Sequence, residues 1–480
     1  MKSSQRSFVK TYVALAILGG IGAYIYFVES KRPETPEKAK PKVFASFDKA
    51  KATTLTLAPK DGETIRVAKE SGAWKLKAPS EAPADGPEID ALLSSVANLE
   101  QDEVVAEGSP KLADFGLESP RLTVSTLVEG QSEPFTLLLG DKSPDGGSVY
   151  AMLPKQNKVF TIASYLETGF QKKPFDLRDR DVLHVKRDAV KTLEVAGADG
   201  GFALARDDKG EWSFTQPFAT RAGRWSVDGL LGTLEGLRME SVAGEASGDK
   251  QLKTYGLDKP ARTLTLGLAD GVSKVLEIGS AADKKEPAKP EPKPAPKPSA
   301  SPSPEKPTKY YAWAKDSGQV VVIPAALVDD LAKGMKEYRA KRLLDVATYD
   351  VEGVEVEADG AKRVYTRATS KDKDGVDQHK WKRTTPDAKD LDTNKVQDVL
   401  FKIGGLEAQD FIDKPAAPES YGLDKPAIKV TLKMGAGKPS PSFEIAIKDN
   451  QAYARRDGDA SLLELDAAKA QELAKAFKEL

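Results

Sequence analysis

The sequence contains no cysteine, and this absence excludes several kinds of chemistry. A chain without thiols forms no disulfide, has no thiolate nucleophile, binds no zinc through cysteine and offers no cysteine for lipidation. The absence is compatible with an oxidising compartment but does not identify one. With 480 residues, the chain is long enough for about three domains that each bury a core.

An excess of charge of either sign is also missing. Lysine and arginine number 72, and aspartate and glutamate number 73, which leaves a formal net charge of −1. Nothing in this balance would steer the whole molecule to nucleic acid, so we expect no nucleic-acid partner. A composition of 40% hydrophobic and 30% charged residues is typical of folded domains, whereas 31 prolines indicate at least one stretch that cannot pack.

Histidine is scarce, and the common catalytic motifs are missing from the sequence. The two histidines, His184 and His379, are far apart, and we interpret both as ordinary strand or surface residues. The sequence has no H-E-x-x-H, no G-x-S-x-G, no G-x-x-x-x-G-K-S/T and no G-x-G-x-x-G between a strand and a helix. We therefore assign no catalytic, cofactor-binding or metal-binding residue, and we expect no enzymatic activity and no cofactor.

One acidic stretch imitates the start of a calcium loop. Asp141, Ser143 and Asp145 precede Gly146, but Met152 stands at the twelfth position, where a bidentate glutamate would be required. Aspartate and glycine are also the expected residues of a hairpin turn, so we predict a turn here.

Two further acidic stretches also lack the pattern of a metal site. KDKDGVD, from Lys371, has Gly375 too early and Arg383 at the twelfth position, so it too is predicted to be a hairpin turn. FDLRDRD contains three carboxylates that alternate with basic residues, which favours a solvated ion-pair stretch over a cation site. These carboxylates are Asp176, Asp179 and Asp181.

The amino terminus contains an uncharged run of 18 residues, TYVALAILGGIGAYIYFV, at positions 11–28. As a helix it would span about 27 Å, close to the hydrocarbon thickness of about 30 Å. Lys2, Arg6 and Lys10 precede it without an acidic residue, which places residues 1–10 in the cytoplasm. No A-x-A-like cleavage site follows, so we predict an uncleaved transmembrane anchor at 11–28 and a linker at 29–42. The alternative is a cleaved signal peptide, and in either case the rest of the chain is exported.

One short stretch of sequence occurs three times. It reads FGLESPRLTVSTL from Phe115, YGLDKPARTLTL from Tyr255 and YGLDKPAIKVTL from Tyr421. Each copy follows a tryptophan by 41, 43 and 40 residues, respectively, and each tryptophan has a proline five positions later. The tryptophans are Trp74, Trp212 and Trp381, and the prolines are Pro79, Pro217 and Pro386.

Between each tryptophan and the motif lies an amphipathic segment with apolar residues at i, i+3, i+4, i+7 and i+10, the spacing of one helix face. These residues are Ile89, Leu92, Leu93, Val96 and Leu99, then Val227, Leu230, Leu231, Leu234 and Leu237, then Val396, Val399, Leu400, Ile403 and Leu406. Around the helix the apolar pattern changes to period two in short segments such as TTLTLAP, ETIRVAK, AWKLKAP, RLTVSTLVE and KVFTIA, which predicts antiparallel strands. A second helical stretch, clearest in AALVDDLAKGMKEYRAKRLL from Ala325, completes the unit.

The repeated motif is explained as a corner between a helical turn and a strand. Gly256 can adopt the positive φ that ends a helical turn, Leu257 can pack inward, and Pro260 can begin a strand without needing an amide partner. Tyr255 completes the motif. This structural explanation needs no ligand.

The second unit is longer because of a proline-rich insertion at residues 283–308. Alternating Lys-Pro and Glu-Pro steps favour polyproline II and cannot build a core. We interpret the insertion as disordered, with a contact to a partner or to the cell wall as the alternative.

These patterns predict an α+β chain of three tandem repeats, each a mainly antiparallel sheet with packed helices, after one N-terminal transmembrane helix. The expected units are residues 43–182, 183–345 and 346–480. The first two units end in a basic exit, FDLRDRDVL at Phe175 and YRAKRLLDV at Tyr338, whereas the third is terminal and lacks this exit.

The repeat resembles the bacterial domain-of-unknown-function family DUF4340. The resemblance rests on a G-x-W-x-L/F strand, the YGLDKP corner, an L-x-I-G strand end, a Tyr-Ala pair and the YRAKRLL exit. The residues concerned are Gly72, Trp74 and Leu76, then Gly210, Trp212 and Phe214, then Leu276, Ile278, Gly279, Tyr311 and Ala312. The third unit departs from it where Ala446 replaces the glycine.

The resemblance implies a membrane-anchored envelope protein, found alongside components of ABC-type transporters similar to gliding-motility systems, without an assigned activity. We therefore expect a non-enzymatic interaction protein of the bacterial inner membrane whose repeats face the periplasm and bind an envelope protein, such as an ABC transporter component.

Two alternatives belong to other functional classes. A glycan-binding or cell-wall-binding module would use exposed aromatics such as Trp74, Trp212 and Trp381, although their strand position favours the core. Trp225 and Trp313 occur only in the second unit, which weakens a shared sugar surface. A hydrolase would need carboxylates assembled in space, and no sequence pattern selects a pair.

Overall fold

The computed structural model describes residue 27 and residues 40–198, 200–246, 248–283, 306–371, 377–435 and 437–480. The predicted anchor at 11–28, apart from residue 27, most of the linker at 29–42 and most of the insertion at 283–308 therefore lie outside the described residues. Within the described part, no helix is long and apolar enough to cross a membrane. The chain divides into two compact units between Asp179 and Arg180.

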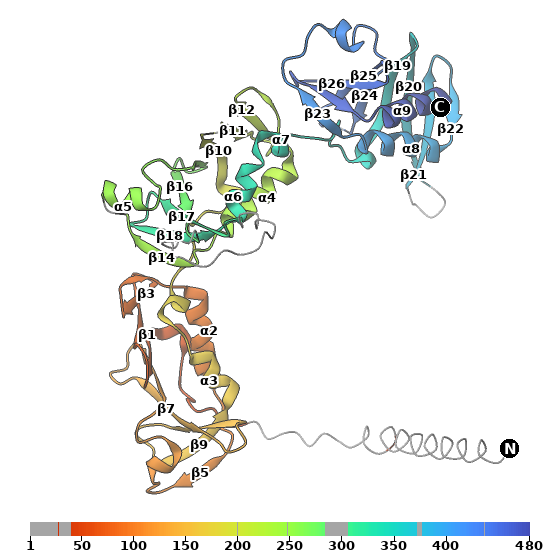
Figure 1. The fold of residues 1–480 in the computed structure, drawn as a ribbon. Coiled ribbons are helices and arrows are strands. Elements are labelled where there is room, and N and C mark those ends of the chain that lie inside the picture. The colour runs from red at the N-terminus through yellow and green to blue at the C-terminus, as the bar shows by residue number, and fades with distance from the viewer. Residues whose placement is uncertain are drawn as a thin grey trace, which may run out of the picture. The chain divides into compact units, whose positions relative to one another are not determined.

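Three antiparallel sheets confirm the predicted tandem repeats (Figure 1). In the described residues each sheet has nine strands, in the orders β4-β3-β2-β1-β6-β7-β8-β9-β5, β13-β12-β11-β10-β15-β16-β17-β18-β14 and β22-β21-β20-β19-β24-β25-β26-β27-β23. Counted from the first strand of each repeat, the three orders are the same. We name the repeats by their sheets: repeat 1 (β1–β9), repeat 2 (β10–β18) and repeat 3 (β19–β27).

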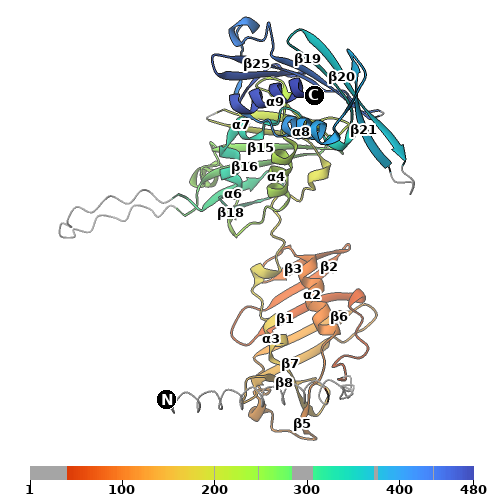
Figure 2. The same ribbon diagram turned by 90° about the vertical axis from the view of Figure 1, so that its right-hand side faces the viewer.

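Repeat 1 belongs to the first compact unit, and its helices α2 and α3 lie against one face of its sheet (Figure 2). Its elements are η2 (Lys49–Lys51), β1 (Ala52–Pro59), β2 (Ile65–Glu70), β3 (Ala73–Ala78), β4 (Ala82–Pro83), α2 (Gly86–Ala97), β5 (Val104–Glu107), η3 (Leu112–Phe115), β6 (Leu122–Val128), β7 (Phe135–Lys142), β8 (Ser148–Met152), β9 (Lys158–Ala163), α3 (Ser164–Phe170) and η4 (Pro174–Leu177).

Repeat 2 begins the second compact unit. Its elements are η5 (Arg187–Ala189), β10 (Val190–Gly197), β11 (Phe202–Arg206), β12 (Trp212–Gln216), β13 (Thr220–Arg221), α4 (Arg224–Glu235), β14 (Ser241–Glu245), α5 (Asp249–Thr254), β15 (Arg262–Leu268), β16 (Ser273–Ala281), β17 (Lys309–Ala314), β18 (Gln319–Pro324), α6 (Ala326–Ala332) and α7 (Gly334–Tyr338).

Repeat 3 completes the second unit. Its elements are η6 (Thr348–Asp350), β19 (Val351–Ala358), β20 (Ala361–Lys371), β21 (Asp377–Thr385), β22 (Lys389–Leu391), α8 (Thr393–Gly404), β23 (Ala408–Ile412), η7 (Pro418–Tyr421), β24 (Ile428–Met434), β25 (Ser442–Lys448), β26 (Gln451–Arg456), β27 (Leu462–Leu465) and α9 (Ala467–Glu479).

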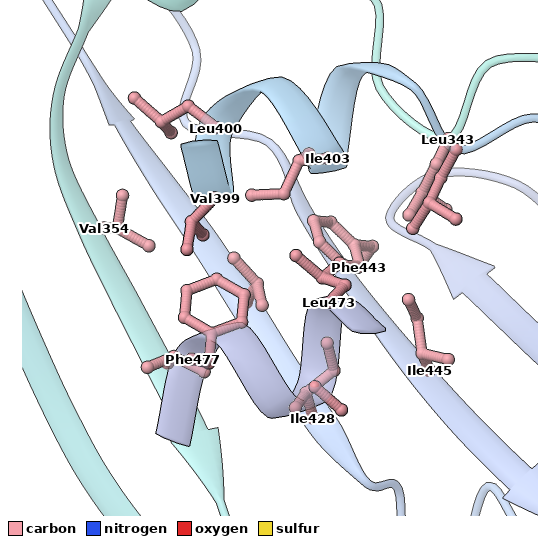
Figure 3. Close-up of a cluster of buried hydrophobic side chains, with 14 of the residues drawn as sticks. Leu343, Val354, Val399, Leu400, Ile403, Ile428, Phe443, Ile445, Leu473 and Phe477 are labelled. Carbon is pink, nitrogen blue, oxygen red and sulfur yellow. The ribbon is translucent and has the colours of Figure 1, made fainter. Parts of the chain in front are cut away.

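The predicted apolar helix faces form the cores. All fifteen predicted positions on the α2, α4 and α8 segments are buried. In repeat 3 they meet the inner residues of the sheet and of α9, such as Phe443 and Phe477 (Figure 3). Burial of several large apolar side chains, worth about 1.5–3 kcal/mol each, is therefore the main stabilising term in each repeat.

The predicted corner is confirmed in all three repeats. Gly116, Gly256 and Gly422 have φ values of 65°, 69° and 74°, in the left-handed region that suits glycine. Each glycine follows a short helical turn, the next leucine is buried, and a strand begins after the proline. The corner therefore turns the chain into β6, β15 and β24.

The second predicted helical stretch is shorter than expected. The helix α6 ends at Ala332, α7 begins at Gly334, whose φ is 68°, and helical structure ends at Tyr338. The residues after Tyr338 are extended instead, because they pair with an edge of the repeat 2 sheet. Arg339 forms an antiparallel bridge with Ala222.

Candidate functional site

The repeated tryptophans are core residues. Trp74, Trp212 and Trp381 are all buried, which confirms the core interpretation and removes them as sugar-stacking residues. Trp313 is partly covered: its Nε1 donates to the carbonyl oxygen of Ser317 (2.7 Å), and Lys315 Nζ lies 3.7 Å from its ring centroid. Trp225, by contrast, is 72% exposed.

Neither histidine lies in an assembled catalytic group. His184 is exposed and has a φ of 48°, and its N–H and that of Leu183 donate to Asp181 Oδ1. This places it in a turn before β10, and not at the start of a strand as its sequence suggested. His379 is an exposed β21 residue whose Nδ1 lies 3.1 Å from Thr369 Oγ1.

The acidic stretch at Asp141 forms the predicted hairpin turn. Ser143 Oγ and the Gly147 N–H donate to Asp145 Oδ1 (2.5 and 3.2 Å), and the Gly146 N–H donates to Ser143 O. The hydrogen bonds from Ser143, which has the largest effect, and from Gly147 lower the pKa of Asp145 below the ordinary value of an aspartate. The carboxylate is therefore occupied in closing the turn between β7 and β8. The tip of KDKDGVD, residues 372–376, lies outside the described residues.

The carboxylates of FDLRDRD have separate local roles. Asp176 accepts from the Lys173 N–H (2.8 Å) and caps η4, whereas Asp181 accepts the two turn amides and lies 3.3 Å from Arg238 Nη1. Across the described residues, no group of three or more His, Asp or Glu side chains is placed to hold a metal ion.

The corner motif joins two parts of each sheet through an aromatic pair. Phe115 packs on Tyr150, Tyr255 on Tyr311 and Tyr421 on Tyr453, with ring centroids 5.0, 4.8 and 5.0 Å apart. The tyrosine of the Tyr-Ala pair thus rests on the corner in every repeat, which is a packing role.

A group of polar residues, all buried except Asp413, connects repeats 2 and 3 within the second compact unit. We call it the junction cluster; it consists of Thr220, Arg339, Asp413, Arg456, Asp459 and Ser461. Sequence patterns did not reveal it, because its members are far apart in the sequence; Thr220 and Asp459, which share a hydrogen bond, are 239 positions apart.

Arg456 and Asp459 form the centre of the junction cluster. Their side chains are 1% and 0% exposed, and Arg456 Nε and Nη2 lie 2.8 and 2.7 Å from Asp459 Oδ2. Arg456 Nη1 also donates to the carbonyl oxygens of Ala340 and Arg342 (2.9 and 2.7 Å). Burial lowers the pKa of the Arg456 guanidinium, and the Asp459 carboxylate opposes that shift. A paired, hydrogen-bonded charge can therefore remain buried here.

Arg339 extends the cluster toward the solvent. Its guanidinium donates to Thr220 Oγ1 (3.2 Å), pairs with Asp413 and lies 3.8 Å from the Phe411 ring centroid. Thr220 Oγ1 in turn donates to Asp459 Oδ1 (2.9 Å). These contacts fix the second and third repeats to the segment that joins them. The polar side chains of the cluster bond to one another, so we interpret the cluster as structural.

The most distinctive surface residues are aromatic and not repeated. Trp225 in α4, Tyr349 in η6 and Phe401 in α8 are 72%, 75% and 76% exposed. The ninth helix position that holds Phe401 in α8 holds Ser94 in α2 and Gly232 in α4. The repeats therefore share their buried residues and differ in their exposed aromatic ones.

The family comparison agrees with these repeated features. The model described as "Domain of unknown function (DUF4340)" matches residues 74–224, 212–287 and 301–426, which is more than half of the chain. The chain belongs to the DUF4340 family. The DUF4340 matches begin at Trp74 and at Trp212, inside the sheets of repeats 1 and 2, so their limits do not coincide with the limits of the sheets.

The other comparisons add no functional information about this DUF4340 protein. No curated protein matches the sequence. Among the matching solved structures is a DNA polymerase sliding clamp from Pseudomonas aeruginosa in complex with a ligand, with 7% sequence identity and a TM-score of 0.15. That match covers 88% of this chain and 93% of the clamp chain, but at this TM-score it supports no argument.

Proposed function

We propose that this protein is a membrane-anchored, non-enzymatic interaction protein of the bacterial cell envelope, with its three repeats in the periplasm. The anchor in this proposal is the uncharged segment 11–28, and its orientation rests on Lys2, Arg6 and Lys10. The proposed partner is an envelope protein, such as a component of an ABC-type transporter, as the family resemblance suggests.

One observation carries the proposal: buried residues are repeated, whereas exposed aromatic residues are not. A large exposed ring such as Trp225 or Phe401 is costly to leave in water and is typical of the centre of protein interfaces. Because these rings contribute nothing to a core, they are the positions at which we propose that a partner makes contact.

The test is co-purification of the tagged, full-length protein from gently solubilised native membranes, followed by mass spectrometry. We expect stoichiometric recovery of an envelope protein with the wild type, and reduced recovery with Trp225→Ala or Phe401→Ala. Truncation of a hot-spot aromatic at an interface costs about 2 kcal/mol or more, which is roughly thirtyfold in affinity. The exposed Gln397 in the same helix as Phe401 gives a matched control, Gln397→Ala.

Recovery of the wild-type protein alone would contradict the proposal. Binding of the soluble repeats to peptidoglycan in place of a protein would replace it with the glycan-binding alternative.

A further inference from the structure

In repeats 1 and 2 the last strand at one end of the sheet is extended by the exit segment. Asp85 N donates to Leu177 O (2.9 Å) and Asp179 N donates to Pro83 O (3.0 Å), beside the bridge between Ala84 and Arg178. These two bonds cover the backbone at the end of β4.

Repeat 2 has the same arrangement with different residues. Gly223 N donates to Tyr338 O (2.7 Å) and Ala340 N donates to Arg221 O (3.1 Å), beside the bridge between Ala222 and Arg339. An arginine thus stands opposite an alanine at the same place in both repeats.

In repeat 3 the equivalent edge is β22, which has no such pairing among the described residues. Ala84 N donates to Trp74 O and Ala222 N donates to Trp212 O, and Leu391 is paired with Trp381. Leu391 is therefore the residue of repeat 3 that corresponds to Ala84 and Ala222. The outward-facing groups are then the Asp390 carbonyl and the Asp392 N–H. Asp390 and Asp392 are both exposed.

In repeats 1 and 2 the exit segment follows the last helix of the repeat, because α3 ends at Phe170 and α7 ends at Tyr338. α9 has no glycine or proline and continues to Glu479. Between α9 and the first turns of α8 lies a hollow of about 250 Å³, lined in part by Asp398, Val399, Glu479 and Leu480.

We propose that β22 is a docking edge for an extended segment of a partner protein, which pairs with Asp390 and Asp392 as the exit segments pair with β4 and β13. The partner segment runs antiparallel to β22, donates an N–H to Asp390 O, accepts from Asp392 N and places a basic residue opposite Leu391. The pattern of this segment is taken from the two exit segments of the chain itself, Leu177-Arg178-Asp179 and Tyr338-Arg339-Ala340. This inference rests on the proposed function and specifies one of its surfaces.

The backbone at Asp392 allows a selective variant. Its φ of −68° suits proline, so Asp392→Pro removes the outward N–H with little change in backbone geometry. It also removes the carboxylate that caps α8 by accepting from Asn394 N (2.9 Å). Asp392→Ala is the matched control, because it loses the same cap and keeps the N–H.

The probe is a fluorescent peptide with the sequence of residues 335–344, MKEYRAKRLL, titrated against the full-length protein in mild detergent. We expect saturable binding to the wild type and to Asp392→Ala, and an affinity about tenfold lower for Asp392→Pro, the effect of one lost backbone bond. A peptide with proline in place of Ala340 cannot donate to Asp390 O. It should bind the wild-type protein no more tightly than the unmodified peptide binds Asp392→Pro.

Equal affinity for wild type and Asp392→Pro, or no binding to either, would overturn the proposal. Co-purification separates it from the proposed function. If the envelope partner is recovered equally with wild type and Asp392→Pro, β22 is not its docking edge and the interaction function stands. If the peptide binds β22 but no partner is recovered, the edge accepts an extended segment and the proposed envelope partner is wrong.

Discussion

At the scale of single residues, the corner motif depends on a close backbone approach that differs between repeats. A Cβ added to Gly140 or Gly279 would lie 2.1 Å from the carbonyl oxygen of Phe115 or Tyr255. In repeat 3 the corresponding residue is Ala446, and there Lys448 Nζ donates to the carbonyls of Glu419 and Ser420. The third corner is therefore held partly by a side chain, and it has an alanine where the other two corners have glycine.

We predict that Gly140→Ala and Gly279→Ala each destabilise their repeat by about 1–3 kcal/mol, because backbone must move to admit the methyl group. Ala446→Gly removes only a buried methyl and adds backbone freedom, so it should cost about 1 kcal/mol. Urea unfolding of the full chain measures the three changes. Equal effects at the three positions would contradict this account of the corner.

A second residue-scale prediction concerns the base of the proline-rich insertion. Thr308 donates both its N–H and its hydroxyl to Asp283 Oδ2 (2.6 Å each), and these bonds, the hydroxyl first, lower the pKa of Asp283. The stabilisation is therefore present above the ordinary aspartate pKa of about 3.9 and is lost as the pH falls through the lower folded value.

The measurement is a pH titration of the labelled Asp283 carboxyl, assigned with Asp283→Asn. We expect a pKa below the ordinary value in the wild type and a higher pKa in Thr308→Val, which keeps only the backbone donor. An unchanged pKa in Thr308→Val would show that the hydroxyl is not the cause.

At the scale of elements, the sequence predicts what is local and misses what is distant. The helix faces around Ile89, Val227 and Val396, the main strands and the corner are set by periodicity and turn residues, and the structure confirms them. The short edge strands, such as β4 and β5, have two and four residues and carry no periodicity of their own. They exist because a neighbouring strand supplies their hydrogen bonds.

The junction cluster was also beyond sequence reasoning. Arg456 and Asp459 belong to the charged stretch RRDGD, yet both side chains are buried against the segment that joins repeats 2 and 3. A buried ion pair depends on which distant backbone covers it, and no local pattern encodes that. The exposed aromatics are likewise visible in sequence only as departures from the repeat, which becomes informative once exposure is known.

The ion pair gives an element-scale prediction. Asp459→Ala leaves Arg456 as a buried charge without its partner, which should destabilise the second compact unit by about 3–5 kcal/mol. Asp457→Ala is the control, because Asp457 is exposed and the bond from Arg221 goes to its backbone carbonyl, which the substitution keeps. Denaturant unfolding monitored by tryptophan fluorescence measures both. A similar small effect for the two variants would show that the pair is dispensable.

At the scale of the whole molecule, we propose that a chain of three repeated α+β modules lies outside the cytoplasm. The three sheets of the same topology are shown by the structure, and membership of DUF4340 is shown by the family match. The location is the proposal on which the interaction function depends, because an envelope partner can reach the exposed aromatics only on the far side of the membrane.

The absence of cysteine allows a direct test of this location. Single variants Ser4→Cys and Trp225→Cys each introduce the chain's only thiol, one before the uncharged segment and one on the exposed start of α4. Spheroplasts of the expressing bacterium are treated with a membrane-impermeant maleimide, before and after permeabilisation. The account predicts that the Trp225→Cys protein is labelled in intact spheroplasts and the Ser4→Cys protein only after permeabilisation. Labelling of the Trp225→Cys protein only after permeabilisation would place the repeats inside the cell and contradict the central claim.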